Sequence, residues 1–182
     1  MAPLLGHEDC ARLAEYLLLS TLDRLGADKG LTAHADLILW SDGGHHDAWI
    51  DLLSRSIYNH SGILRMPQVL GHLGLRMHTA TQHQLCIGSC SVLIGPDAIA
   101  LQASDILQLT DSIVESRIGF IPAEDGGYVA VACRDLIPLM FSEDIPWGTS
   151  VVASMTQERL CAEGIQAVWM NKQPDQIGRA HV

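Results

Sequence analysis

Apolar side chains recur at intervals of three and four residues between Asp9 and Leu25, and this period predicts an amphipathic helix. Gly26 follows directly, at a position where glycine often ends a helix. We expect the leucine face of this helix to pack close to a central buried strand over Asp36–Trp40, which is a short apolar run. The apolar positions of the helix are Cys10, Leu13, Ala14, Leu17, Leu18, Leu22 and Leu25.

The residues after this strand predict a turn and a second helix. Ser41–Gly44 consists of residue types that favour turns. Apolar residues from Trp49 to Ile57 then share one helical face, and Gly62 and Pro67 end the segment. The first third of the chain is therefore expected to run helix, strand, turn, helix.

Beyond Pro67 the pattern changes to short apolar stretches between polar residues and glycines, which is typical of strands joined by turns. Pro122–Gly127 is expected to form a polar loop. Ser154 and Gln157 have the spacing of a capping box for a short helix that ends near Gly164. The predicted strands are Leu73–Met77, Leu85–Ile87, Val92–Ile94, Ala98–Leu101, Tyr128–Cys133, Leu136–Phe141 and Ile165–Met170.

No repeat, low-complexity tract or linker divides the chain, so residues 1–176 are expected to form a single mixed α/β domain. Residues 177–182 resemble the translation of a common sequencing-library adaptor. We exclude them as a scar, and with them His181 as a candidate ligand. On this interpretation the natural C-terminus is missing and the domain is a fragment of a longer chain.

Charge and cysteine content limit the partners and the compartment. The net charge is -10, and no cluster of Lys or Arg offers the concentrated basic surface that phosphate contacts need, so strong nucleic-acid binding is not expected. The five cysteines are odd in number and no signal segment precedes them, which favours a reducing cytoplasm. No apolar stretch near the N-terminus approaches the roughly 20 residues of a membrane helix.

The densest polar group lies in the predicted strand-to-helix turn, where His45, His46 and Asp47 follow two glycines and Asp51 comes four residues later. Two histidines and several carboxylates could bind zinc. The group lacks, however, the two histidines four residues apart of the zinc-protease motif, and turns of this kind carry Asp, Gly and Ser for capping alone. We predict no metal here.

Two cysteine groups are further candidates. His78, His83, Cys86 and Cys90 could form a mixed zinc site, but Cys86 lies in an apolar run and no second cysteine pair completes the site, so buried free cysteines are the simpler interpretation. Cys133 precedes an arginine, which could favour a reactive thiolate. Because Cys133 continues an apolar run, packing is the preferred interpretation.

No nucleophile elbow, phosphate-binding lysine loop or dinucleotide-binding glycine pattern is present in the sequence. We therefore predict no catalytic residue, no bound cofactor and no metal ligand, and interpret the chain as a structural protein rather than an enzyme.

Taken in order, these segments resemble the C-terminal part of the major capsid (head) proteins of tailed phages. The resemblance implies an α+β capsid-type fold, with a central sheet flanked by helices and a β-rich second half. The matching segments are Leu25–Asp28, Asp36–Trp40, His45–Ile57, Leu70–Met77, Val92–Ala100, Glu115–Arg117 and Arg134–Trp147.

The resemblance also implies a function. It predicts a virion subunit that is made in the bacterial host cytoplasm, assembles with copies of itself into the head shell and meets scaffolding and portal proteins. Trp147, which follows a proline in a predicted loop, is a candidate interface anchor, although it could equally cap the core. The alternatives are a small cytosolic metal-dependent enzyme that uses His45, His46 and Asp47, or a homo-oligomeric binding module.

Overall fold

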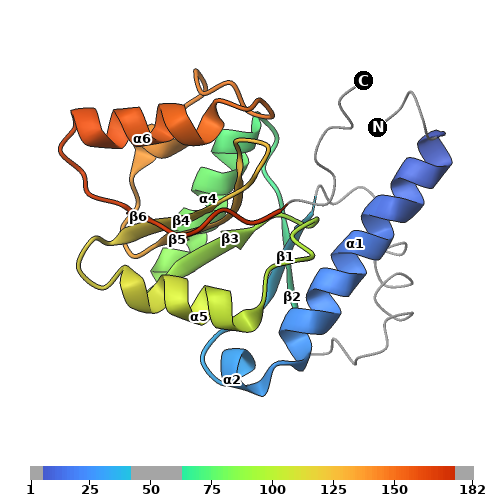
Figure 1. The fold of residues 1–182 in the computed structure, drawn as a ribbon. Coiled ribbons are helices and arrows are strands. Elements are labelled where there is room, and N and C mark those ends of the chain that lie inside the picture. Colours follow the sequence, from blue (N-terminus) through green and yellow to red (C-terminus); the bar gives the residue numbers. More distant parts are fainter. Residues whose placement is uncertain (1–5, 42–62, 175–182) are drawn as a thin grey trace.

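The computed structural model describes residues 6–41 and 63–174 (Figure 1). Its helices are α1 (His7–Ala27), α2 (Lys29–Thr32), α4 (Leu73–Ile87), α5 (Ala103–Ser112), α6 (Val152–Ala162) and the 3-10 helix η1 (Pro138–Phe141). Its strands are β1 (Ile38–Ser41), β2 (Leu64–Pro67), β3 (Ser91–Ile94), β4 (Ile118–Pro122), β5 (Tyr128–Cys133) and β6 (Val168–Trp169).

The centre of the molecule is a four-stranded sheet in the order β3-β5-β4-β6. β5 pairs antiparallel with both β3 and β4, and β4 pairs in parallel with β6. All of β4 and all of β5 except Tyr128 are buried, which explains why their sequences are almost continuously apolar. Both faces of this sheet must therefore be covered.

The two faces are covered by different helices, as Figure 1 shows, with α5 below the sheet and α6 above it. Met77 of α4 packs into the same hydrophobic cluster as Leu160 of α6. Side chains of β5 alternate between two hydrophobic clusters: Ala130 and Ala132 pack with α5, while Val131 and Cys133 pack with Leu160 of α6 and with η1. The result is a layered α/β arrangement of helix, sheet and helix.

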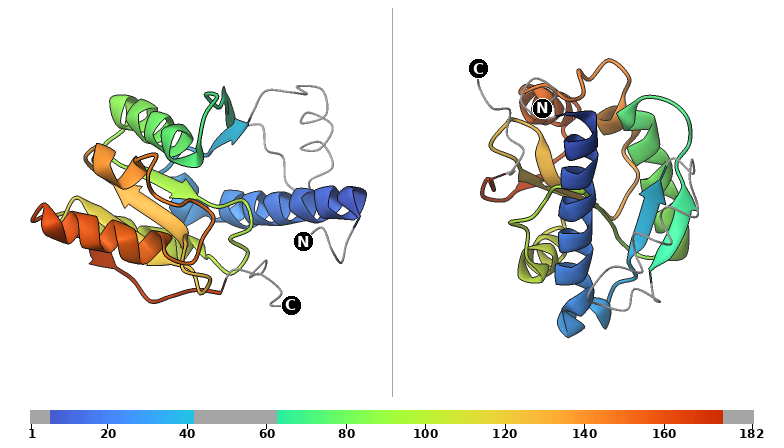
Figure 2. Two further views of the ribbon diagram at one scale, coloured as in Figure 1. Left: turned by 90° about the horizontal axis from the view of Figure 1, so that it is seen from above. Right: turned by 90° about the vertical axis from the view of Figure 1, so that its right-hand side faces the viewer.

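A second, two-stranded sheet lies beside the first (Figure 2). Its strands β1 and β2 are parallel, with Ile38 opposite Leu64. Within the described residues no strand pair joins this sheet to the four-stranded one. α4 connects them instead, because it contacts β3 and its His83 ring packs edge-on against Trp40 of β1 at 5.5 Å.

Some predicted elements are confirmed and others are wrong. The amphipathic helix is confirmed as α1, whose buried residues include Leu17, Leu18 and Leu25, and Tyr128–Cys133 is confirmed as β5. The strand over Asp36–Trp40 exists as β1, but it is half-buried and, among the strands of the described residues, pairs with β2 alone, so its prediction as a central buried strand is wrong. The predicted turn and helix after it lie outside the described residues.

The largest error concerns Leu73–Met77 and Leu85–Ile87, which are not strands but the two ends of α4. Leu136–Phe141 contains the 3-10 helix η1, and Ala98–Leu101 is a loop. The expected capping box at Ser154 and Gln157 is also wrong, because α6 begins at Val152 without a side-chain cap. None of the described helices is long and apolar enough to cross a membrane.

Candidate functional site

Loops that follow three strands converge at one edge of the four-stranded sheet. β3 and β4 run in the same direction because both are antiparallel to β5, and β6 is parallel to β4. The carboxyl ends of β3, β4 and β6 therefore lie at one edge, which we call the carboxyl edge. Its polar side chains are those of Asp97 after β3, Glu124 and Asp125 after β4, Asn171 and Gln173 after β6, and Asp105 of α5.

The loop after β3 places Asp97 at this edge. Gly95 N–H donates to the Val129 carbonyl at 3.2 Å, which continues the ladder between β3 and β5. A Cβ on Gly95 would lie 2.9 Å from Asp97 Oδ1, so the carboxylate folds back over a glycine. Ala98 and Leu101 are buried beneath the loop and leave Asp97 half-exposed.

Helix α1 fixes the same loop from outside through Arg24. Its Nε donates to the Leu101 carbonyl and its Nη2 to the Ala98 carbonyl, each at 2.7 Å. Partial burial lowers the pKa of this guanidinium from its ordinary value. Arg24 is thus committed to backbone carbonyls and serves to hold the loop that carries Asp97.

The turn between β4 and β5 presents Asp125. Ala123 N–H donates to the Gly127 carbonyl at 3.0 Å, and Gly127 N–H donates to Asp125 Oδ1 at 2.8 Å. One carboxylate oxygen therefore shapes the turn. Glu124 and Asp125 are both exposed.

Helix α6 anchors this turn from above the sheet. Gly126 has φ +92°, and a Cβ there would lie 2.0 Å from the Ser150 carbonyl oxygen, so the two backbones touch. The Gly126 carbonyl accepts from Ala153 N–H at 2.9 Å. Tyr128 Oη and Thr156 Oγ1 share a hydrogen bond, and burial raises the pKa of Tyr128 to about 12, so this phenol stays protonated near neutral pH.

The segment after β6 crosses the same turn. Gln173 N–H donates to the Pro122 carbonyl at 2.9 Å, and the Gln173 carbonyl accepts from Glu124 N–H at 3.1 Å. The Gln173 side chain donates through Nε2 to Asp105 Oδ2 at 3.0 Å. The end of the described chain is therefore tied both to the Asp125 turn and to the first turn of α5.

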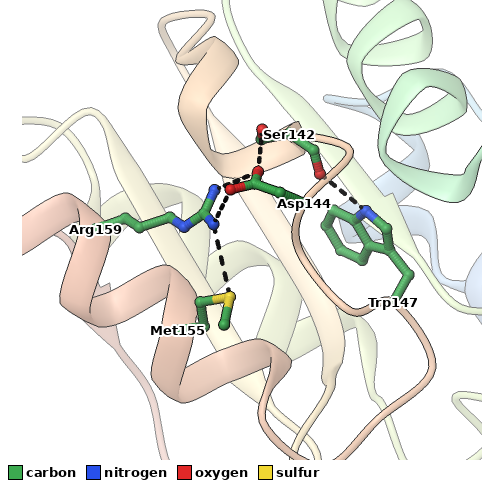
Figure 3. A network of polar contacts seen from close by, with 5 residues as sticks. All are labelled: Ser142, Asp144, Trp147, Met155 and Arg159. Carbon is green, nitrogen blue, oxygen red and sulfur yellow. Dashed lines mark hydrogen bonds and ion pairs between the residues drawn. The ribbon is translucent and has the colours of Figure 1, made fainter.

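A polar network holds the segment that leads into Ser150 (Figure 3). Arg159 of α6 forms a bidentate ion pair with Asp144, with distances of 2.9 Å and 2.6 Å. Hydrogen bonds from Arg159 and from Ser142 lower the pKa of the Asp144 carboxyl. Trp147 Nε1 donates to the Ser142 carbonyl at 3.2 Å.

Most residues singled out from the sequence are not brought together. His45, His46, Asp47 and Asp51 lie outside the described residues. His78 packs edge-on against Phe141, while Cys86 is exposed at the far end of the same helix. Among residues 6–41 and 63–174 no group of three His, Cys, Asp or Glu side chains could hold a metal ion. The prediction that the chain has no resident metal stays a prediction.

The side chains of Cys133 and Trp147 are packed in the interior or against a helix. Cys133 is buried between β3 and β4, and burial raises its pKa to about 12, so the packing interpretation is confirmed. A Cβ on Gly74 would lie 2.8 Å from Trp147 Nε1, which places the indole against the first turn of α4. Trp147 thus caps the packing of α4.

Sequence reasoning missed the carboxyl edge as a site, although it predicted Pro122–Gly127, which contains Asp125, as a polar loop. Asp97 follows an apolar strand and a Gly–Pro pair, and Asp125 precedes two glycines. The signal available in the sequence was the acidic residues that follow apolar strands. The order of the strands, which brings these loops together, could not be predicted from the sequence.

The chain resembles known proteins in sequence and in fold. A family model described as "Uncharacterized protein conserved in bacteria (DUF2064)" matches residues 21–149. No curated protein is significantly similar in sequence.

Two solved structures share the fold. A candidate nucleotide-diphospho-sugar transferase from Desulfovibrio desulfuricans G20 superposes with a TM-score of 0.77 at 22% identity, over 96% of this chain and 73% of that one. The 4-diphosphocytidyl-2C-methyl-D-erythritol synthase from Anaerococcus prevotii DSM 20548 superposes with a TM-score of 0.60 at 12% identity, over 86% of this chain and 77% of that one.

These similarities overturn the phage interpretation. The fold is the α/β fold of these two solved structures, so the predicted capsid-type α+β fold is wrong. The match to a family of bacterial proteins likewise contradicts a virion subunit that assembles with scaffolding and portal proteins. Short apolar strands in a given order occur in many folds, which is why the order of segments misled.

Proposed function

The chain belongs to the bacterial DUF2064 family, and we propose that it is an enzyme that binds a nucleotide-diphospho-sugar at the carboxyl edge and transfers the sugar to an acceptor hydroxyl. The prediction that it is not an enzyme is thereby replaced. The observation that carries the proposal is the convergence of the Asp97 loop and the Asp125 turn at one edge of a sheet with this fold.

The position of the edge supports a substrate site. In open α/β sheets, ligands bind outside the carboxyl ends of the strands. Here that edge is held from three sides: by Arg24 of α1, by the contact of α6 with Gly126, and by the segment that carries Gln173. Such support keeps catalytic groups in position, as group transfer requires.

The side chains fit a metal ion that arrives with the substrate. Mg²⁺ is commonly held by one or two carboxylates together with substrate phosphates. Asp97, half-exposed on the loop directly after β3, is the side chain that would bind such an ion beside a diphosphate. The bound ion would neutralise charge that develops on the departing diphosphate.

The transfer can be written with this chain's own groups. The acceptor oxygen bonds to the anomeric carbon while the bond from that carbon to the diphosphate oxygen breaks. The diphosphate leaves with the electron pair, and the acceptor proton passes to the Asp125 carboxylate. Oδ1 of Asp125 accepts from Gly127 N–H, so Oδ2 is the oxygen left for this role.

Calorimetric titration tests the proposal. The wild-type chain and its Asp97→Asn variant are titrated with UDP, GDP, CDP and ADP in the presence of Mg²⁺. We expect one of them to bind, and Asp97→Asn to weaken its binding by roughly tenfold or more, because a charge-assisted contact is lost.

Asp111→Asn is the matched control, because Asp111 is exposed at the opposite end of α5 from Asp105. It should leave the dissociation constant unchanged. The proposal fails if none of the four nucleotides binds, or if the control weakens binding as much as Asp97→Asn does.

A further inference from the structure

The connection between β2 and the first turn of α4 carries a group of exposed apolar side chains. Leu70 is 89% exposed. Val69, Leu73 and Leu75 are between 37% and 48% exposed. Single apolar residues on a surface are ordinary, but several within one short connection form a patch. Figure 2 shows this connection at the periphery of the molecule, and we call residues 68–76 the leucine turn.

The polar groups of the leucine turn bond to one another. His72 Nδ1 accepts from Leu75 N–H at 3.3 Å and so caps α4. Arg76 donates through Nε to the Gly71 carbonyl at 3.0 Å and through Nη1 to Gln68 Oε1 at 3.4 Å. The turn is therefore a preformed element whose backbone is held by its own side chains.

The apolar side chains of the turn lie on its outer side. Gly74 is buried, and a Cβ there would lie 2.2 Å from the Phe141 carbonyl oxygen, so this side of α4 packs against η1. Leu73 and Leu75 flank Gly74 and keep nearly half of their surface exposed. Neither they nor the two apolar residues before α4 belong to the hydrophobic clusters that cover the sheet.

The leucine turn lies in a part of the chain without carboxylates. Residues 63–96 contain no Asp or Glu, although the whole sequence has 21 of them. With histidine counted as neutral, the charged side chains of this range are those of Arg65 and Arg76. Arg65 is exposed beside the patch, at the second position of β2.

Carboxylates from other elements weaken this positive charge little. Glu143 and Asp144 follow η1, which packs against α4. Asp144 is neutralised by its ion pair with Arg159, so of these two carboxylates only Glu143 opposes the arginines. Exposed charges farther away than about 8 Å are largely screened at physiological ionic strength. The surface at the leucine turn is therefore positive, although the net charge of the chain is -10.

The chemistry of the patch favours a lipid surface over a protein partner. The residues that dominate protein interfaces are enriched in Trp, Tyr and Arg, whereas Leu and Val are under-represented among them. Here the exposed side chains are aliphatic, and the one at the tip, Leu70, is almost fully exposed. Segments that bind at a bilayer surface combine apolar side chains with Lys or Arg, and their binding strengthens with buried apolar area and with anionic lipid.

We propose that the leucine turn docks the folded chain onto the surface of an anionic phospholipid bilayer. Leu70 and Leu73 enter the boundary between headgroups and acyl chains, and Arg65 and Arg76 lie at the lipid phosphates. This docking is independent of the proposed transfer reaction, because it uses no residue of the carboxyl edge.

Sedimentation with large unilamellar vesicles tests the proposal on the full chain. One set of vesicles is pure phosphatidylcholine, and the other contains equal parts of phosphatidylcholine and phosphatidylglycerol. We expect the chain to sediment with the anionic vesicles and much less with the neutral ones. Added NaCl should weaken this binding, because it screens the attraction between arginine and phosphate.

Two variants divide the binding into its parts. Leu70→Ser should weaken partition into anionic vesicles by roughly tenfold, because a leucine side chain no longer leaves water. Arg65→Gln should weaken it by about fivefold, because one cation near the lipid surface is lost. Both side chains are exposed, so circular dichroism should show an unchanged fold.

The matched controls lie outside the turn. Val114→Ser removes a 54% exposed apolar side chain beside Glu115, and Arg12→Gln removes an exposed arginine of α1. Each should leave vesicle binding unchanged. The proposal is overturned if the chain stays in the supernatant with anionic vesicles, or if the controls weaken binding as much as Leu70→Ser and Arg65→Gln do. Self-association without vesicles that Leu70→Ser abolishes would instead identify the turn as a protein interface and would also overturn it.

Discussion

Replacing Gly126 by alanine should destabilise the chain more than the same substitution at the other described glycines with positive φ, Gly71, Gly148 and Gly164. At Gly71 the new Cβ would clash only with the flexible end of the Leu75 side chain, which can yield. Gly126 has φ +92°, and its new Cβ would lie 2.0 Å from the Ser150 carbonyl oxygen. A residue with a Cβ in such a sparsely populated conformation costs about 1–3 kcal/mol. Relief of the clash must also move the backbone hydrogen bond from Ala153 to Gly126, which contributes about 0.5–1.5 kcal/mol.

The two contributions together predict a loss of about 1.5–4.5 kcal/mol in the free energy of unfolding. For a chain of this size that corresponds to a fall in Tm of roughly 3–18 °C. Urea unfolding followed by circular dichroism measures the change directly. Because Asp125, the proposed proton acceptor, is the neighbouring residue, sugar transfer should slow as well at temperatures where the variant is folded.

Gly148→Ala and Gly164→Ala are the matched controls. Both glycines have positive φ, +79° and +69°, but a Cβ on either meets nothing within 4 Å. They carry the backbone strain without the clash, so each should cost about 1–2 kcal/mol. If Gly126→Ala proves no more costly than these two, the argument from the contact between Ser150 and Gly126 is refuted.

Three further predictions follow from the contacts around the site. Arg24→Met should lower the free energy of unfolding by about 1–3 kcal/mol, because two backbone carbonyls lose their donor. Arg12→Met removes an exposed ion pair with Glu8 and should leave the free energy of unfolding almost unchanged, and urea unfolding distinguishes the two variants. The folded-state pKa of Asp144 is lowered, so its ion pair stabilises the fold fully above the unfolded pKa near 4. This stabilisation disappears as the pH falls towards the folded-state pKa, and the Asp144→Asn variant should lack this pH-dependent loss of stability in an acid titration. A thiol reagent should modify the exposed Cys86 and Cys161 rapidly but reach the buried Cys133 only on unfolding, and fast reaction of Cys133 in the native protein would contradict its placement.

Local patterns predicted some elements because the signal lay within each element. The leucine spacing of α1 and the apolar run of β5 each reflect a single buried face or a fully buried strand, and both are confirmed. In α5, Ala103, Ile106 and Leu109 show the same kind of spacing, and the capping box of Gln102 and Asp105 begins the helix. That helix could have been predicted and was not.

Other elements depend on contacts that the sequence pattern does not contain. Leu73, Leu75 and Met77 alternate with other residues and favour a strand by period, while Gly74 favours a turn. In the fold, Gly74 lies in helix α4, and a Cβ there would lie 2.2 Å from the Phe141 carbonyl oxygen, which explains why a glycine occupies this position. The glycine thus marks a close approach of η1 to α4, which only the tertiary structure reveals.

The site shows the same limit more strongly. Asp97 and Asp125 are separated by a helix and a strand in the sequence, and they share an edge only because β5 lies between β3 and β4 in the sheet. Without that order, nothing in the sequence placed the two turns side by side. Recognition of the carboxyl edge therefore required the topology, whereas its residue types were visible in the sequence.

The supports of the carboxyl edge come from widely separated segments, and this has a consequence for how activity should depend on stability. Arg24 lies near the start of the described chain, Gly126 and Ala153 in its middle and second half, and Gln173 at its end. Each makes backbone contacts that form only when the whole domain is folded. Local loosening of α1, α6 or the final segment should therefore displace Asp97 or Asp125 before the sheet itself unfolds, because the buried strands β4 and β5 hold the core independently of these contacts. Loss of ligand binding should consequently precede loss of secondary structure as denaturant rises.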